Sequence, residues 1–361
     1  MTEIHRSSLT GESPLDSCEQ PLIACTDLVL LDLDGVVYRG PHAVAHAAES
    51  LATARERGVS LHYVTNNAGR PPQDVADHLR DLGIPTLENE VTTAAQAAAV
   101  LIAADYPAGT KVLVVGGPGL FLALEEVGMV PVTSAEDDPA VVVQGLSRTL
   151  AWPELAEAAY AIGNGAEFIA SNLDSTLPTE RGMAPGNGSL VAAVAHATGV
   201  RPRATGKPEP EIFHQAAERA GGRRPVMIGD RLDTDIAGAR AAGYPSMHVF
   251  TGVDGPRELL RAGAHERPTL LAHDLRGLLE PHPAVAPEGD SWRCRDARAQ
   301  VRDSRLELTE NGLTTVLSGA DAAAEATISL DGLRALLAAG WTADGLDLTR
   351  LTDLHVAPER A

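Results

Sequence analysis

Two aspartates separated by a single residue are the first residues of the chain whose spacing suggests chemistry. They stand in the sequence Asp32-Leu33-Asp34-Gly35, directly after a short apolar run. Side chains alternate along a strand, so both carboxylates are expected on the same side of it, and Gly35 allows a sharp turn. Two carboxylates at the end of a buried strand are costly unless a cation or a reaction uses them. The pair alone is equally compatible with an acidic turn that closes a strand.

A second acidic cluster comes late in the chain. The apolar run that ends at Ile228 is followed by the sequence GDRLDTD, which contains Asp230, Asp233 and Asp235. Acidic side chains are favoured at the start of a helix, which explains Asp233 well and Asp235 in part. It explains Asp230 less well, because that residue follows a glycine at the end of a buried strand. Hard cations bind carboxylate oxygens, so the cluster is interpreted as part of a magnesium site.

A polar turn closes the second apolar run of the chain. It consists of Thr65, Asn66 and Asn67. A hydroxyl and backbone N–H groups at a strand-to-helix turn can hold phosphate oxygens. An ordinary polar turn has the same composition. The phosphate-binding interpretation is therefore supported only because the acidic clusters occur in the same chain.

The lysine content of the chain is low. Only two of the 29 basic residues are lysines, Lys111 and Lys207, and a coding preference for arginine explains the scarcity. Lys111 precedes an apolar run without polar neighbours and is interpreted as a surface residue. Lys207 stands in the sequence TGKP before a predicted helix. A lysine there provides a compact charge that suits a phosphate already held by other donors.

Apolar runs and helical patterns alternate over most of the chain. Strands are predicted at 28–37, 59–65, 111–115, 140–146, 167–172, 224–230 and 246–250, and helices include 43–57, 71–83, 91–106 and 209–220. This order is typical of parallel β/α units with right-handed crossovers. In such sheets, ligands bind beyond the carboxyl ends of the strands. All four polar segments are predicted to lie at those ends or at the start of a following helix.

The predicted fold class is α/β, a Rossmannoid, doubly wound parallel-sheet core with an inserted α/β cap and a small α+β C-terminal extension. The insert is placed at residues 97–203, so the core consists of 21–96 and 204–280. Residues 1–20 are polar and are predicted to form a disordered tail. A segment rich in proline and acid, EPHPAVAPEGD, leads into the extension at 285–361.

The charge of the chain excludes several classes of function. A net charge of −20 and a pI near 4.9 disfavour binding to nucleic acids or anionic membranes. The three cysteines, Cys18, Cys25 and Cys294, fit neither a disulfide framework nor a zinc site, which favours a cytoplasmic location. The N-terminus lacks the apolar core of a signal peptide, and no apolar stretch is long enough to span a bilayer.

The ordered motifs resemble those of the haloacid dehalogenase (HAD) superfamily of phosphohydrolases. The resemblance covers about residues 27–255 and rests on the strings DLDGVVYRG, VTNNAGR, GKPEP and GDRLDTDI. The large α/β insert is similar to the NagD-like, class IIA cap. This group includes nitrophenyl, phosphoglycolate and glycerol 3-phosphate phosphatases. The C-terminal piece resembles that of actinobacterial glycerol 3-phosphate phosphatases, where it has been likened to part of an acetyltransferase fold, but it contains no acyl-CoA pyrophosphate loop.

The resemblance assigns a role to each motif residue. Asp32 attacks phosphorus, and Asp34 first protonates the leaving alkoxide and then deprotonates a water. Magnesium is held by the carboxylate of Asp32, the backbone carbonyl of Asp34 and Asp230, and Asp235 completes the metal site by steadying the waters on the ion. Phosphate oxygens are bound by residues from three turns, Gly35, Thr65, Asn66, Asn67 and Lys207. The enzyme class that this implies is a hydrolase of phosphoric monoesters.

The insert is expected to close over the substrate and to determine the substrate specificity. The segment Ser171-Asn172-Leu173-Asp174 ends a predicted strand. Asn172 and Asp174 can bind substrate hydroxyls, which fits a polyol phosphate, although each is equally compatible with a surface turn. Arg181 is an alternative, because it would bind the carboxylate of phosphoglycolate.

We therefore expect a small phosphorylated metabolite as substrate, with glycerol 3-phosphate as first choice. Phosphoglycolate, sugar, pyridoxal and nitrophenyl phosphates are the alternatives. Relatives with this type of cap often form homodimers through it, so a homodimer is an expectation by resemblance.

Two other classes of protein fit the sequence less well. A phospho-aspartate receiver domain also uses an acidic pocket, a threonine and a lysine, but it is about half as long as this core and orders the motifs differently. A dinucleotide-binding oxidoreductase is suggested by the sequence GGPG at 116–119. The spacing differs from the G-x-G-x-x-G fingerprint, and Pro118 removes an N–H group that a pyrophosphate would need.

Overall fold

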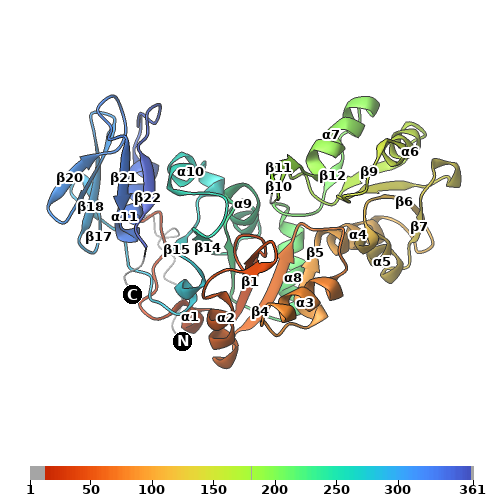
Figure 1. Cartoon of the computed structure of the whole chain (residues 1–361), viewed down its shortest axis with the longest axis horizontal. Coiled ribbons are helices and arrows are strands. Elements are labelled where there is room, and N and C mark those ends of the chain that lie inside the picture. Colours follow the sequence, from red (N-terminus) through yellow and green to blue (C-terminus); the bar gives the residue numbers. More distant parts are fainter. Residues whose placement is uncertain (1–12, 180, 359–361) are drawn as a thin grey trace. The chain divides into compact units, whose positions relative to one another are not determined.

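The chain folds into two compact units (Figure 1). The computed structural model describes residues 13–179 and 181–358. One unit contains residues up to 61 together with 222 onwards, and the other contains residues 62–221. We call them the first and the second unit.

Four buried parallel strands form the centre of the first unit. They are β1 (Leu28–Leu31), β13 (Pro225–Gly229), β14 (Ser246–Val249) and β15 (Leu270–Ala272), in the order β15-β14-β13-β1. Its helical segments are α1 (Leu22–Cys25), α2 (Ala47–Glu56), η4 (Leu232–Ile236), α9 (Ala237–Ala241), α10 (Pro256–Arg261), η5 (Ala264–Glu266) and η6 (Leu275–Leu278). The four strands are apolar and short, as expected of a sheet that is covered on both faces.

The first strand is shorter than the sequence predicts. β1 ends at Leu31, and the carbonyl of Leu33 accepts hydrogen bonds from three successive N–H groups, those of residues 36–38. The chain then forms a hairpin of β2 (Tyr38–Arg39) and β3 (His42–Ala43). Neither Asp32 nor Asp34 therefore lies in a regular strand. Asp32 is buried, whereas Asp34 is exposed.

The second unit contains a parallel strand pair and a separate five-stranded sheet. The pair is β4 (Ser60–Thr65) and β5 (Val91–Thr93), with α3 (Pro72–Asp81), η2 (Glu88–Glu90), α4 (Ala94–Asp105) and α8 (Pro210–Ala220). The sequence predicts one helix over 91–106, but residues 91–93 form β5. Thr93 then caps α4 by accepting a hydrogen bond from the N–H of Gln96.

The five-stranded sheet corresponds to the predicted insert. Its parallel strands follow the order β12-β9-β8-β6-β7 and are β6 (Lys111–Val115), β7 (Val130–Val132), β8 (Val141–Gln144), β9 (Glu167–Ala170) and β12 (Arg203–Ala204). Helices α5 (Pro118–Glu126), η3 (Ala135–Asp137), α6 (Trp152–Gly163) and α7 (Asn187–Thr198) connect them. The hairpin of β10 (Thr176–Thr179) and β11 (Gly182–Pro185) lies between β9 and α7 in the chain. The predicted α/β architecture is thus confirmed.

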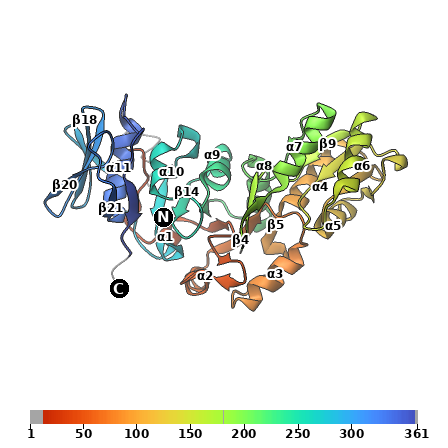
Figure 2. The ribbon, with the colours of Figure 1, turned by 45° about the horizontal axis from the view of Figure 1, so that its top comes forward.

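The C-terminal extension belongs to the first unit and has an α+β architecture, as predicted. Five antiparallel strands follow one another, β16 (Ala286–Glu288), β17 (Ser291–Cys294), β18 (Ala297–Arg302), β19 (Arg305–Glu310) and β20 (Leu313–Val316). Strands β21 (Glu325–Ile328) and β22 (Asp353–Val356) pair in parallel. Helix α11 (Leu330–Thr342) lies beside β18 (Figure 2).

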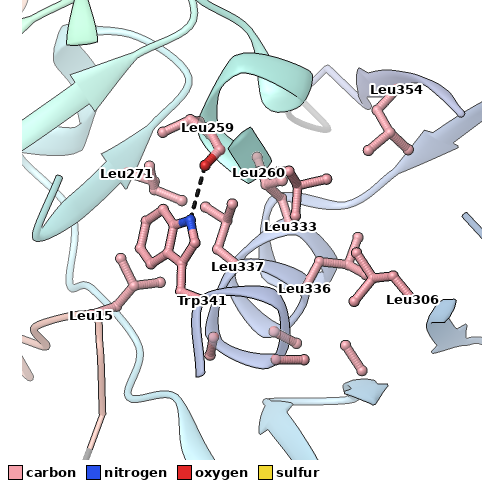
Figure 3. Packing of buried hydrophobic residues seen from close by; sticks show 14 of the residues in the cluster. Leu15, Leu259, Leu260, Leu271, Leu306, Leu333, Leu336, Leu337, Trp341 and Leu354 are labelled. Atoms are coloured by element: carbon pink, nitrogen blue, oxygen red, sulfur yellow. Dashed lines mark hydrogen bonds between the residues drawn. The ribbon is translucent and has the colours of Figure 1, made fainter. Parts of the chain in front are cut away.

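Helix α11 joins the extension to the rest of the first unit. Its leucines pack with those of α10 and β15 in one buried apolar cluster (Figure 3). The indole Nε1 of Trp341 donates a hydrogen bond of 2.9 Å to the carbonyl of Leu259. Nη2 of Arg334 donates one of 2.8 Å to the carbonyl of Leu271. The extension therefore shares a core with the parallel sheet of this unit.

Truncation of Trp341 is expected to destabilise the first unit. The change Trp341→Ala removes a buried indole and leaves the Leu259 carbonyl without its donor. Such truncations cost about 3–5 kcal/mol. Urea unfolding followed by circular dichroism measures the effect. Trp152→Ala is the matched control, because Trp152 is 74% exposed on α6 and its loss should change stability by no more than about 0.5 kcal/mol. Equal effects of the two changes would contradict the shared core.

The N-terminal segment differs from its prediction in two ways. The sequence predicts a disordered tail at residues 1–20. Residues 1–12 lie outside the described part of the chain, whereas residues 13–20 pack on the sheet. The N–H of Asp16 bonds to the carbonyl of Thr269, and Cys18 pairs with His282. Cys18 is also joined to Cys25 by a disulfide. Cysteine spacing did not predict this bond, because the turn of α1 brings the two residues together.

Among the described residues, no helix is long and apolar enough to cross a membrane.

Candidate active site

Three buried carboxylates of the first unit converge at the carboxyl ends of β1 and β13. Asp32 follows β1, Asp230 follows β13, and Asp235 lies in η4. One oxygen atom from each lies within 4.8 Å of the others. The parallel pairing of Leu31 with Ile228 brings the ends of the two strands together, so the first and fourth sequence motifs meet as predicted.

Glycines make room for these carboxylates. A Cβ atom on Gly35, whose φ is +90°, would lie 2.5 Å from Oδ2 of Asp230, and one on Gly252 would lie 1.7 Å from the same atom. A Cβ atom on Gly229 would lie 2.2 Å from Cβ of Asp235. A methyl group cannot occupy any of these positions. Gly35 is therefore required both for its backbone conformation and for the close approach of Asp230.

Backbone N–H groups orient two of the carboxylates. Val253 donates a hydrogen bond of 2.7 Å to Oδ2 of Asp230, and Arg231 donates one of 3.2 Å to Oδ2 of Asp235. Asp235 lies in a single turn of π-helix, a conformation that is rare and often occurs at functional sites. These bonds hold the two carboxylates in fixed directions toward the cluster.

The donor set of the cluster fits a hard divalent cation. Three carboxylate oxygens in one buried place carry concentrated negative charge, which is unfavourable without a compensating cation. Magnesium prefers oxygen ligands and is usually bound by one or two carboxylates together with waters. Asp233 is outside the cluster, because its exposed carboxylate pairs with Arg231 at 2.8 Å. The side chain of Asp34 is exposed and is also outside it.

The predicted polar residues of the second unit meet around the carboxamide of Asn66. Its Oδ1 accepts a hydrogen bond of 2.8 Å from the N–H of Lys207, and its Nδ2 donates one of 3.1 Å to the carbonyl of the same residue. Nδ2 also lies 3.1 Å and 3.2 Å from the two carboxylate oxygens of Asp174. Nδ2 of Asn172 donates to the carbonyl of Asn66 at 2.8 Å. One side chain therefore links three motif segments that are distant in sequence.

Close packing supports this arrangement. A Cβ atom on Gly206 would lie 2.4 Å from the carbonyl oxygen of Ser171 and 2.6 Å from Oδ1 of Asn66. Lys207 and Thr65 are both buried. Oγ1 of Thr65 accepts a hydrogen bond of 3.1 Å from the N–H of Asn67. The turn that carries Lys207 is thus fixed by contacts on several sides.

Two candidate residues have local contacts of their own. Oδ1 of Asn67 accepts hydrogen bonds from the N–H groups of Gly69 and Arg70, so this side chain stabilises the turn before α3. Arg181 lies in the turn between β10 and β11, where its N–H bonds to Oγ1 of Thr179.

The segment that follows β14 also belongs to the site, although the motifs in the sequence do not include it. Its residues Gly252, Val253 and Asp254 lie against Asp230. His248 on β14 bonds through Nε2 to the carbonyl of Asp254 at 3.0 Å, and burial lowers its pKa to about 4, so it is neutral at pH 7 and donates from Nε2. The signal in the sequence is a glycine-rich turn, TGVDG, at the end of a buried strand.

Family models match two segments of the chain. Residues 29–130 match the haloacid dehalogenase-like hydrolases, and residues 204–278 match the HAD-hydrolase-like family. The chain is also 43% identical over 339 residues to the D-glycerol 3-phosphate phosphatase of Mycobacterium tuberculosis, covering 92% of this chain and 89% of that protein. The chain therefore belongs to the haloacid dehalogenase-like hydrolases, as the four motifs predict.

Two solved structures are similar to this chain. A glycerol phosphate phosphatase from Mycobacterium tuberculosis, determined in complex with magnesium, matches with a TM-score of 0.80 and 40% identity over 95% of this chain and 97% of that chain. A double mutant of a thermostable NPPase from Geobacillus stearothermophilus matches with a TM-score of 0.63 and 34% identity over 69% of this chain and 96% of that chain. The predicted fold class, a HAD core with an inserted cap, and the predicted enzyme class, a hydrolase, are confirmed.

Proposed function

We propose that this enzyme is a magnesium-dependent phosphatase that hydrolyses glycerol 3-phosphate to glycerol and phosphate. The observation that carries the chemistry is the buried cluster of Asp32, Asp230 and Asp235 at the ends of two parallel strands. Similarity to the mycobacterial glycerol 3-phosphate phosphatase over 92% of the chain supports the substrate.

In this proposal, Asp32 and Asp34 divide the chemical work. A carboxylate oxygen of Asp32 forms a bond to phosphorus, and the bond between phosphorus and the ester oxygen breaks. Asp34 gives a proton to the departing alkoxide, which leaves as glycerol. Asp34 then takes a proton from a water, and the oxygen of that water attacks phosphorus and regenerates Asp32. The exposure of Asp34 suits a group that exchanges protons with substrate and solvent.

Magnesium would be held by the carboxylates of Asp32, Asp230 and Asp235 and by the backbone carbonyl of Asp34. When bound, it neutralises charge on the phosphoryl group and on the carboxylates. The chain fixes these oxygens before the ion binds. Gly35 and Gly252 leave space beside Asp230, and backbone N–H groups orient Asp230 and Asp235.

The roles of the second unit follow from the order of the motifs along the chain. Thr65 and the N–H group of Asn66 bind phosphoryl oxygens. Asn67 supports this turn, because its N–H donates to Oγ1 of Thr65. The N–H of Gly35 donates to the carbonyl of Tyr38 instead. Lys207 offsets the charge of the phosphoryl group. The two hydrogen bonds between the Asn66 side chain and the backbone of Lys207 support this role, because they fix the position of the Lys207 backbone.

Asn172 and Asp174 are proposed to recognise the glycerol hydroxyls. Their segment is held by Asn66, and a carboxylate accepts hydrogen bonds from hydroxyl groups but repels a second carboxylate. This favours a polyol phosphate over phosphoglycolate, which would instead need a cation such as Arg181. Sugar, pyridoxal and nitrophenyl phosphates are the other candidates.

The substrate is a small phosphorylated metabolite. A homodimer through the insert and a cytoplasmic location remain proposals made from the sequence.

A panel of phosphate esters tests the proposed substrate. Phosphate release is measured for glycerol 3-phosphate, phosphoglycolate, a sugar phosphate, pyridoxal phosphate and 4-nitrophenyl phosphate, with magnesium and with excess chelator. We expect the highest kcat/KM for glycerol 3-phosphate and no release with chelator. A higher kcat/KM for phosphoglycolate would indicate that Arg181, and not Asn172 and Asp174, recognises the substrate. Phosphate release that is unaffected by chelator would exclude the magnesium mechanism.

Loss of the Asn66 side chain is expected to weaken catalysis without unfolding the protein. Asn66→Ala removes the bonds to the backbone of Lys207 and to Asp174. Groups that orient a functional side chain contribute about 10- to 100-fold in activity, so kcat/KM for glycerol 3-phosphate should fall by that factor. Asn164→Ala is the control, since Asn164 is an exposed residue at the end of α6. An Asn66→Ala enzyme with unchanged kcat/KM would contradict the linking role.

A further inference from the structure

The loop between β14 and α10, residues 250–255, contacts the segment that carries Asp230 and Asp235 at two points. The backbone N–H of Asp254 donates a hydrogen bond of 3.1 Å to the carbonyl of Asp230. Oδ2 of Asp254 accepts one of 2.7 Å from the N–H of Leu232, the first residue of η4. We propose that Asp254 is a positioning residue for the divalent-cation site. This inference rests on the metal site of the proposed function.

Asp254 fixes the turn between two candidate ligands. The first N–H groups of a helical segment have no partner within the segment, and a side-chain oxygen that accepts from one of them stabilises its start. Here the acceptor comes from a residue 22 positions away in the chain. Because η4 carries Asp235, the bond to Leu232 sets where η4 begins, and the bond to Asp230 sets where β13 ends. The distance between the two carboxylates therefore depends on Asp254.

The loop itself is anchored at both ends. On the β14 side, Nε2 of the buried His248 bonds to the carbonyl of Asp254 at 3.0 Å. On the α10 side, Oε2 of Glu258 accepts a hydrogen bond of 3.1 Å from the N–H of Gly255. Helix α10 is held in turn by the bond from Trp341 to Leu259 (Figure 3). Asp254 thus connects the candidate metal ligands to a fixed part of the first unit.

The test measures magnesium affinity directly, without substrate. Isothermal titration of metal-free protein with magnesium chloride is performed on wild type, Asp254→Ala and Asp254→Asn. Outer-shell partners of metal ligands contribute about 10- to 100-fold in affinity, so Asp254→Ala should raise the Kd for magnesium by that factor. Asp254→Asn keeps an oxygen that accepts from Leu232 and should stay within about threefold of wild type, because the hydrogen bond rather than the charge is responsible.

Asp233→Ala is the matched control. Asp233 lies in the same segment, but its exposed side chain pairs with Arg231 and does not contact the cluster. Its magnesium Kd should equal that of wild type. Circular dichroism in chelator establishes that each variant is folded. If Asp254→Ala does not fold, Asp254→Ser, which also lacks the oxygen that reaches Leu232, is measured by the same criterion.

Two results would overturn the inference alone. One is a folded Asp254→Ala or Asp254→Ser protein with wild-type magnesium affinity. The other is an Asp254→Asn protein that loses as much affinity as Asp254→Ala. Absence of magnesium binding in wild type would instead overturn the proposed metal site, and phosphatase activity toward another ester would leave the inference unaffected.

Discussion

Asp32→Asn should abolish phosphate release while the protein stays folded. The change keeps the size of the side chain but removes the negative charge and the nucleophilic oxygen that would form the bond to phosphorus. Removal of a catalytic nucleophile lowers kcat by about 10⁴- to 10⁶-fold. Phosphate release from glycerol 3-phosphate at saturating magnesium measures the effect, and thermal unfolding shows whether the fold is retained.

Asp233→Asn provides the control for this experiment. It makes the same chemical change on a carboxylate that is exposed and paired with Arg231, outside the cluster. Its kcat should be within about twofold of wild type, as expected of a surface substitution. An Asp32→Asn enzyme that retains a tenth or more of the wild-type kcat would exclude Asp32 as the nucleophile.

Lys207→Met should have the second-largest effect. The change keeps an unbranched side chain of similar length and removes the charge that is proposed to stabilise the phosphoryl group. Loss of one such electrostatic contact costs about 10²- to 10³-fold in kcat. Lys207 is buried and its backbone is held by Asn66. Water is therefore not expected to take the place of the lost ammonium group.

Lys111, the only other lysine of the chain, allows a control with the same substitution. Lys111→Met changes a surface residue whose Nζ bonds to the carbonyl of Asp137, and activity should be unchanged. Lys207→Arg is expected to lower kcat as well, since the broad guanidinium group does not replace a compact charge in a buried place. Full activity in Lys207→Met would contradict the proposed role, and full activity in Lys207→Arg alone would show that any cation suffices there.

The sequence was sufficient to predict the carboxylate cluster because its geometry is that of a parallel sheet. Asp32 and Asp230 each follow an apolar run, and parallel strands place their carboxyl ends at one edge. The pairing of β1 with β13 confirms this part of the prediction. The alternation of strands and helices likewise predicted the two α/β regions, because the punctuation by glycine and proline is local.

The sequence did not predict how the turns are built. Strand periodicity continues past Leu31, but β1 ends there and a turn around the carbonyl of Leu33 follows it. Residues 91–93 were assigned to a helix, because three residues are too few to show a strand period. Such choices depend on which distant backbone groups are available as partners, and a local pattern does not contain that information.

The contacts that hold the site are also distant in sequence. Asn66 bonds to residues 108 and 141 positions away, Asp174 and Lys207. The sequence identified all three as candidates but suggested that they contact substrate, whereas the structure also links them to one another. The turn TGVDG marks the loop in the sequence, but it does not single out Asp254, because the partner Leu232 is recognised only in the folded chain.

The most direct test of the mechanism is to trap the phosphoryl group on Asp32. In Asp34→Asn, 4-nitrophenyl phosphate should still react, because its leaving group needs no proton, whereas hydrolysis of the aspartyl-phosphate should be slow. Acid-quenched protein is digested and analysed by mass spectrometry. We predict one nitrophenolate released rapidly per protein molecule and one phosphoryl group on the peptide that contains Asp32. Rapid release of nitrophenolate with no phosphoryl group on the protein, or with the group on another residue, would contradict the proposal.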